Sequence, residues 1–308
     1  MYRPIRFLSR GVSRPLPWLL VFGLTIGCGT SDEGDGADGD GPDDSAVGGS
    51  MGGPPSGGGA METPPGDKLS GVEVPAGEAA TAGRLVDTTG APVEGVRVLC
   101  CSSETCLIDS TDADGVYLHI GIDPTHRYKM QVTDTEGRYS DLLYYQPYAV
   151  DTLSTMETDV IVHPLSAELI DWPADTGGQV SLAGGELSLT AEPGALDYPL
   201  GKPKTLQAER VPVDQLPPYS PAPWGDTPGA LAYVFTPATV EITTPAALEI
   251  TLTEPLEEGA SYAIWNADSH TGDMVAAGTA TVNAEGVLVA EDTSEITYFS
   301  TLVLFPTP

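Results

Sequence analysis

Polar and hydrophobic residues between positions 78 and 165 alternate in short runs, which is the spacing of β-strands rather than helices. The clearest runs are Gly83–Asp87, Val96–Leu99 and Tyr117–Ile120. Turn sequences rich in Gly, Pro and Asp separate them, for example Thr89–Pro92 and Asp112–Gly115. Short strands joined by such turns predict an antiparallel β-sandwich in this part of the chain.

The same pattern continues from residue 166 to residue 308, without a convincing helical period. The runs that predict strands are Gln179–Leu182, Glu186–Thr190, Thr205–Val211, Leu231–Phe235, Thr239–Thr243, Leu248–Leu252, Ser261–Trp265, Met274–Val282, Val287–Ala290 and Ile296–Leu304. This number of strands is enough for a second two-sheet sandwich with its own core. The predicted fold class is therefore all-β, with two antiparallel β-sandwich domains at residues 78–165 and 166–308.

The longest predicted loop, Pro212–Thr227, is rich in proline and carries Tyr219 and Trp224. A loop of this length in a compact domain is often functional. Its proline and aromatic residues suit the recognition of a partner, and they equally suit a rigid cover strapped over the sandwich.

Residues 1–27 have the features of a secretory signal peptide. They hold four arginines and no acidic residue, and they include the apolar run Leu16–Ile26. This run is shorter than the roughly 20 apolar residues of a membrane-spanning helix, which argues against an uncleaved anchor.

The end of this segment, Leu24-Thr25-Ile26-Gly27-Cys28, resembles the lipobox of bacterial lipoproteins. The resemblance implies lipidation of the Cys28 thiol, cleavage before it, and acylation of the new amino terminus. Two or more acyl chains bind a membrane stably, so they would tether the protein permanently. Thr25 departs from the usual leucine, and the alternative is an ordinary secretory signal with an incidental cysteine. Gly29, where lipoproteins retained at the inner membrane carry Asp, implies an outer-membrane lipoprotein facing the periplasm or the exterior.

Residues 28–77 are predicted to form a disordered acidic linker behind the lipidated cysteine. Gly, Asp, Pro, Ser and Ala dominate, and no basic residue precedes Lys68 in this stretch. Such a sequence buries too little apolar surface to offset its chain entropy. The whole chain has a formal net charge of −31, and removal of the four arginines of residues 1–27 brings it near −35. The mature chain is therefore predicted to repel nucleic acids and anionic lipid surfaces.

The glycines, the proline and the turns of the first predicted sandwich fall in an order that resembles the carboxypeptidase regulatory-like domain. The order is Gly83-x-Leu85-Val86-Asp87-x-x-Gly90-x-Pro92-Val93-x-Gly95-Val96-x-Val98, followed by Thr111-Asp112-Ala113-Asp114-Gly115-Val116-Tyr117. The resemblance implies a transthyretin-like fold and a non-catalytic role for residues 78–165. No zinc carboxypeptidase accompanies it, because none of the four histidines is followed by glutamate at the required spacing.

The second predicted sandwich is similar to ZU5 domains. The similarity is carried by Gly177-Gly178 with Val180 and Leu182, Glu192–Leu196, Phe235-x-Pro237, Pro245 with Leu248, and Phe299-Ser300. Some ZU5 domains cleave themselves at His-Phe-Ser, so the resemblance implies self-cleavage at Phe299-Ser300 as the alternative, enzymatic function. Tyr298 stands in place of the histidine, and a neutral phenol is a poor base, so we expect the chain to stay intact.

Cys100, Cys101 and Cys106 remain once Cys28 is lipidated. In an oxidising exterior, Cys106 is expected to pair with one of the two adjacent cysteines, which strand alternation places on opposite faces. The shorter loop favours Cys101–Cys106, and Cys100–Cys106 is the alternative. The odd cysteine is expected to be buried or to pair between molecules. Adjacent cysteines make poor tetrahedral zinc ligands, so no metal site is predicted.

Residues 137–148 gather four tyrosines. Exposed tyrosines can stack on sugar rings or contact a protein, while the β-propensity of tyrosine equally suits strand packing. With the aromatic residues of the long loop, the candidate binding surface comprises Tyr144, Tyr145, Tyr148, Tyr219 and Trp224.

Positive sequence evidence for an enzyme is missing. The chain has no metal-ligand spacing, no credible context for a serine nucleophile and no glycine loop for a phosphate. We therefore predict a non-enzymatic binding or structural module of the bacterial cell envelope, with no catalytic residue, cofactor or metal. Its predicted partners are the membrane, through the lipid anchor, and an unknown protein or glycan.

Overall fold

The computed structural model describes residues 67–198, 204–254, 256–290 and 296–307. The predicted signal peptide, Cys28 and most of the predicted linker lie outside the described residues. The described chain is all-β, as the alternating pattern predicted. Its helical elements are three 3-10 turns, η1 (Asp67–Leu69), η2 (Ala183–Gly185) and η3 (Val213–Gln215). Within these ranges, no helix has the length and apolar character needed to cross a membrane.

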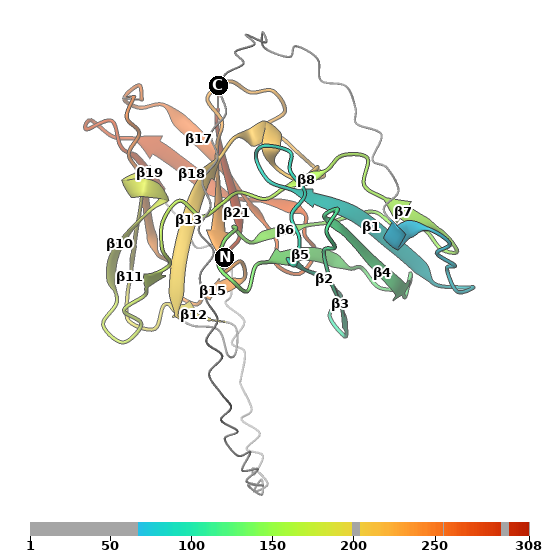
Figure 1. Ribbon diagram of the computed structural model, residues 1–308. Coiled ribbons are helices and arrows are strands. Elements are labelled where there is room, and N and C mark those ends of the chain that lie inside the picture. Colours follow the sequence, from blue (N-terminus) through green and yellow to red (C-terminus); the bar gives the residue numbers. More distant parts are fainter. Residues whose placement is uncertain (1–66, 199–203, 255, 291–295, 308) are drawn as a thin grey trace, which may run out of the picture. The chain divides into compact units, whose positions relative to one another are not determined.

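The N-terminal sandwich consists of two sheets, ordered β4-β1-β7 with β8 also paired to β1, and β3-β2-β5-β6 (Figure 1). Neighbouring strands are antiparallel, except that β1 pairs in parallel with β7 and β8. The strands are β1 (Ala79–Val86), β2 (Arg97–Cys101), β3 (Cys106–Ser110), β4 (Val116–Ile122), β5 (Lys129–Thr133), β6 (Leu142–Tyr144), β7 (Leu153–Thr155) and β8 (Val160–Ile161).

The C-terminal sandwich consists of a ten-stranded sheet and a three-stranded sheet, ordered β10-β11-β16-β19-β18-β17-β21-β14-β13-β9 and β12-β15-β20. Their strands are β9 (Ile170–Asp171), β10 (Gly178–Leu182), β11 (Leu187–Ala191), β12 (Leu196–Asp197), β13 (Thr205–Val211), β14 (Leu231–Thr236), β15 (Val240–Ile242), β16 (Ala247–Ile250), β17 (Ser261–Ala267), β18 (Met274–Val282), β19 (Leu288–Ala290), β20 (Tyr298–Phe299) and β21 (Thr301–Pro306). The single run predicted at Ile296–Leu304 is divided at Ser300, because β20 pairs with β15 while β21 pairs with β14 and β17.

Strands β14 and β21 are buried on both faces. On β14, Tyr233 and Phe235 belong to the core of the C-terminal sandwich, whereas Ala232 and Val234 belong to a second core built mainly from the N-terminal sandwich. Val303 on β21 lies in that second core as well. Because side chains alternate across a strand, two-sided burial requires apolar residues at successive positions. The two sandwiches therefore pack together through a shared apolar core.

The loop between β13 and β14 covers this shared core. Tyr219 and Trp224 are buried and lie within it. The hydroxyl of Tyr219 donates to the carbonyl oxygen of Leu143 at 2.7 Å and lies 2.8 Å from the hydroxyl of Thr301. The loop is therefore a cover that joins the two sandwiches, and its two large aromatic side chains are not available for recognising a partner.

The first described residues are pinned to the edges of both N-terminal sheets. Lys68 Nζ donates to the carbonyl oxygen of Ser110 at 2.8 Å and to that of Val116 at 3.2 Å, and it lies 2.7 Å from the carboxylate of Asp109. The same carboxylate accepts a hydrogen bond from the backbone N–H of Leu118. A positive charge at the edge of a sheet protects that edge from pairing with another chain.

Candidate functional site

The turn between β17 and β18 brings the C-terminal sandwich against β5 and β6. The amine of Lys129 donates to the carbonyl oxygen of Ser269, and Arg127 forms an ion pair with Asp273. Gly272 has φ +74° and lies against the main chain of Tyr144. The turn is held by Asp268, which accepts hydrogen bonds from Thr271 and from the backbone N–H of His270. Burial acts to raise the pKa of Asp268, but these hydrogen bonds outweigh it and lower the pKa overall.

A groove of about 270 Å³ lies beside this turn, at the boundary of the two sandwiches. Its lining side chains all carry a hydroxyl, an amide, an amine or an imidazole group, and we call it the junction groove. They are Ser102, Ser103, Lys129, Gln131, Thr239, Ser269, His270 and Tyr298. Residues from five separate segments of the chain therefore converge on one polar groove.

Thr239 has an unusual backbone conformation in this groove. Its φ is +78°, a region that β-branched residues rarely adopt. The conformation is held by a 2.8 Å hydrogen bond from the N–H of Thr239 to the carbonyl oxygen of Phe299. Strain of this kind costs about 1–3 kcal/mol and is concentrated at functional sites. The strained residue is one of those that line the junction groove.

Lys129 is the cationic side chain of the junction groove. Burial lowers the pKa of its amine, and the charge of Asp268 acts in the opposite direction. Because the amine also bonds to the Ser269 carbonyl, its charge is partly offset before any ligand enters.

A second groove, of about 540 Å³, also borders the β17–β18 turn, through Asp273. Its wall includes Pro147, Pro218, Pro221, Met274 and Val275, together with the ion pair of Arg127 and Asp273. The Arg127 guanidinium carbon is 3.8 Å from the centre of the Tyr145 ring, so the cation covers one face of this tyrosine.

The predicted aromatic surface is wrong for three of its five members. Tyr144, Tyr219 and Trp224 are buried, and the Tyr144 hydroxyl lies 3.0 Å from that of Tyr117 inside the core. The cause is that β6 and the covering loop are both enclosed between the sandwiches. Tyr145 and Tyr148 are half-buried, and Tyr148 bonds to the main chain of Tyr128 and His126. Strand packing, the alternative for this tyrosine-rich segment, thus accounts for most of it.

A disulfide joins Cys101 to Cys106, the pair favoured by the shorter loop. It closes the tip of the hairpin between β2 and β3, which contains Ser102 and Ser103 of the junction groove. Cys100 is a free thiol buried in the core, and burial raises its pKa to about 12. Its thiol is therefore kept protonated and unreactive.

The histidines do not form a catalytic cluster. His119 and His163 are buried, with Nε2 atoms that have no hydrogen-bond partner among the described residues. His126 lies beside Asp123 and Glu104, and His270 packs edge-on against Tyr298. Within the part of the chain that the structure describes, no group of three or more His, Cys, Asp or Glu side chains is placed to hold a metal ion.

Ser300, the serine of the alternative self-cleavage site, is buried. Its hydroxyl donates to the carbonyl oxygen of Ala267 at 2.6 Å and lies 3.1 Å from the side-chain oxygen of Asn266. Neither group is a base that could activate the hydroxyl toward the Phe299 carbonyl carbon.

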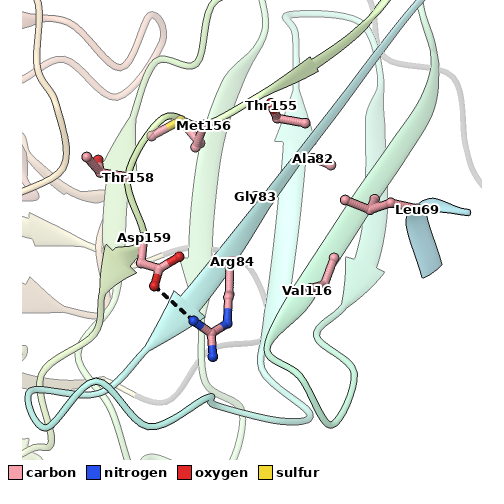
Figure 2. Close-up of a pocket in the computed structure, with 9 residues that line it drawn as sticks. All are labelled: Leu69, Ala82, Gly83, Arg84, Val116, Thr155, Met156, Thr158 and Asp159. Atoms are coloured by element: carbon pink, nitrogen blue, oxygen red, sulfur yellow. Dashed lines mark hydrogen bonds and ion pairs between the residues drawn. The ribbon is translucent and has the colours of Figure 1, made fainter. Parts of the chain in front are cut away.

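Another cavity, of about 210 Å³, lies beside β1 where the chain leaves β7 and enters β8 (Figure 2). Leu69, Ala82 and Met156 line it, and Figure 2 shows Arg84 and Asp159 joined by a 3.0 Å ion pair at one end. Arg84 also donates to the carbonyl oxygen of Asp114. The charged groups of this cavity are thus already paired.

No protein-family model matches this chain, and no curated protein matches it. Among solved structures, it is similar to the Bacillus anthracis TIE protein at 9% identity, over 69% of this chain and 43% of that one, with a TM-score of 0.25. It is also similar to a candidate carbohydrate-binding protein from Bacteroides uniformis ATCC 8492 (10% identity, 73% of this chain, 78% of that one, TM-score 0.23). A third similar structure is a DUF3823 family protein from Parabacteroides merdae ATCC 43184 (9% identity, 76% and 100%, TM-score 0.23). The chain spans less than half the length of the first of these, and similarities at this level assign it no function.

Proposed function

We propose that this chain is an outer-membrane lipoprotein of the bacterial cell envelope that displays a non-enzymatic binding or structural head. In this proposal, residues 1–27 are removed, Cys28 carries the lipid, and residues 28–77 hold the head away from the membrane. The head comprises residues 78–165, related to carboxypeptidase regulatory-like domains, and residues 166–308, related to ZU5 domains. The arrangement of β1–β8 in two four-stranded sheets supports the first relationship.

The observation that carries the proposal is the junction of the two sandwiches. They share an apolar core, and several contacts fix them across it: Tyr219 to Leu143, Asp141 to Thr236 and Ala238, and Arg127 to Asp273. A jointly buried core and buried hydrogen bonds make a head of fixed geometry, which is what a displayed binding or structural module requires. The polar junction groove lies at the boundary that these contacts hold in place.

The anchor is tested by metabolic labelling with an alkyne analogue of palmitate in a bacterial host, followed by membrane fractionation. We expect label and membrane association in the wild type, and loss of both in Cys28→Ala. Ser31→Ala, a substitution in the same segment, is the control and should behave as wild type. An unlabelled wild-type protein recovered in the soluble fraction would contradict the lipoprotein proposal.

The expectation that the head does not cleave itself is tested separately. The test is intact-mass measurement of the purified mature protein after prolonged incubation. A mass that corresponds to an uncut chain through Pro308 supports the proposal. A fragment ending at Phe299 would establish self-cleavage instead.

A further inference from the structure

We propose that the junction groove binds a single neutral sugar ring. This inference rests on the proposed function, since it names the ligand class of the displayed head. The hydrogen-bonding groups assigned to the sugar hydroxyls are those of Ser103, Gln131, Thr239 and Tyr298.

These four side chains have unused hydrogen-bonding capacity. None of their polar groups makes a hydrogen bond to another side chain or main-chain group in the described ranges, and all four line the same groove. They come from the disulfide-closed β2–β3 turn, from β5, from the segment before β15, and from β20. Two of these segments belong to each sandwich. A polyhydroxylated ligand supplies the several donors and acceptors that such a set can satisfy together.

The net charge of the chain disfavours an anionic ligand, and the lysine of the groove already has a partner. The amine of Lys129 is already bonded to the Ser269 carbonyl and lies in the field of Asp268. The whole chain also carries a formal net charge of −31, which repels anions at long range. A neutral ligand does not need the Lys129 amine as a free cation, and the net negative charge of the chain does not repel it.

The lining and size select against an apolar or large ligand. Each lining residue has a polar group, and apart from the phenol of Tyr298 and the imidazole of His270 the groove has no aromatic surface. Its volume of about 270 Å³ is just below the roughly 300–1,000 Å³ typical of small-molecule sites. One sugar ring fits this description, with its hydroxyls toward the amide and hydroxyl groups.

The strain at Thr239 gives the proposal a distinctive test. If Thr239 is held at positive φ in order to present its hydroxyl, Thr239→Gly should relieve the strain and remove the ligand contact together. We expect this variant to unfold at a higher temperature than wild type while binding sugar about fivefold or more weakly. If Thr239 had a merely structural role, the substitution would not raise the unfolding temperature while weakening sugar binding.

Binding is measured by ligand-observed NMR and calorimetry on the disulfide-intact mature protein. The probes are D-glucose, D-galactose, D-mannose and N-acetyl-D-glucosamine, each at millimolar concentration. Wild type should bind at least one of them. Gln131→Leu and Tyr298→Phe, which remove hydrogen-bonding groups with little change of shape, should each weaken that binding about fivefold or more. Tyr145→Phe, in the neighbouring groove, is the matched control and should leave it unchanged.

Three outcomes would overturn the inference. Folded wild-type protein that binds none of the four sugars is the first. The second is binding that survives the Gln131, Tyr298 and Thr239 substitutions, and the third is binding that is lost only in Tyr145→Phe. None of these results touches the labelling of Cys28 or the intact-mass measurement, so the lipoprotein proposal stands or falls independently.

Discussion

Gly272 and Tyr144 come from different sandwiches, and their main chains touch. A Cβ atom built on Gly272 would lie 2.4 Å from the carbonyl carbon of Tyr144 and 2.5 Å from its oxygen. Backbone atoms cannot move aside as a flexible side chain would. A glycine at the tip of the β17–β18 turn therefore sets how closely this turn approaches β6.

Gly272→Ala is expected to destabilise the protein for two reasons. The positive φ of +74° costs a non-glycine residue about 1–2 kcal/mol, and the overlap with Tyr144 adds about 1–3 kcal/mol. Gly137→Ala is the control, because Gly137 has φ +70° and open space around its Cβ position. Urea denaturation of both variants should show the larger loss for Gly272. Equal losses would mean that the contact with Tyr144 does not limit the approach of the two sandwiches.

Tyr219→Phe is expected to lower the free energy of unfolding by about 1–3 kcal/mol, because the Leu143 carbonyl and the Thr301 hydroxyl each lose a buried partner. Tyr198→Phe is the matched control. The Tyr198 hydroxyl is buried and has no hydrogen-bond partner among the described residues, so its removal should change stability by less than about 0.5 kcal/mol. Thermal and chemical denaturation measure both. If Tyr219→Phe left the free energy of unfolding unchanged, the covering loop would be held by apolar packing alone.

Lys68→Met is expected to cost about 1–2 kcal/mol of stability, since the Ser110 and Val116 carbonyls and the Asp109 carboxylate lose their shared cation. We also expect more self-association, because the edges of β3 and β4 lose the charge that covers them. Lys204→Met is the control, as Lys204 is exposed and its side-chain amine has no hydrogen bond or ion pair to another described residue. Denaturation and analytical ultracentrifugation supply the readouts. If Lys68→Met changed neither the stability nor the self-association of the protein, the amine would have no role at the sheet edges.

Stability is expected to fall as the pH drops from about 6.5 to about 4. Burial lowers the pKa of His119 from 6.5 to about 4, with Asp109 acting to raise it and Lys68 to lower it. In this window the unfolded chain binds a proton that the folded chain does not, so acid favours unfolding by up to about 3 kcal/mol. Burial also lowers the pKa of His163, which adds to the loss in the same direction.

The carboxylates titrate in a different window. Asp109, Asp134 and Asp268 have pKa values lowered from 3.8, so their contribution is lost only at still lower pH. Urea denaturation between pH 7 and pH 4 therefore reports mainly the buried histidines. His119→Leu should reduce the pH dependence by more than half, and an undiminished slope in this variant would show that His119 is not its main source.

The alternating runs of residues 78–308 were sufficient to predict an all-β chain, because the period of two is a property of each strand by itself. The limits of β13 and β18 match the predicted runs. The favoured cysteine pair was also accessible from sequence, since the two cysteines flank a short turn. Ile296–Leu304 was predicted as one strand because a change of sheet at Ser300 leaves no mark on the local pattern.

Whether Tyr144, Tyr219 and Trp224 are buried was decided only by the packing of one sandwich on the other. Their local sequences suit an exposed surface and a core equally well, because tyrosine and tryptophan carry both apolar area and a polar group. One available signal was the unbroken apolar runs Leu231–Phe235 and Leu302–Phe305, which indicate strands covered on both faces.

The junction groove could not be predicted in the same way. Ser103, Gln131, Thr239 and Tyr298 are unremarkable in sequence and far apart along the chain. They meet only because the disulfide-closed turn, β5, β15 and β20 come together where the sandwiches join. The sequence by itself determined the strands and the separation of polar and apolar faces. Tertiary structure decided which faces meet and which polar groups are left without partners, because that depends on contacts between distant segments.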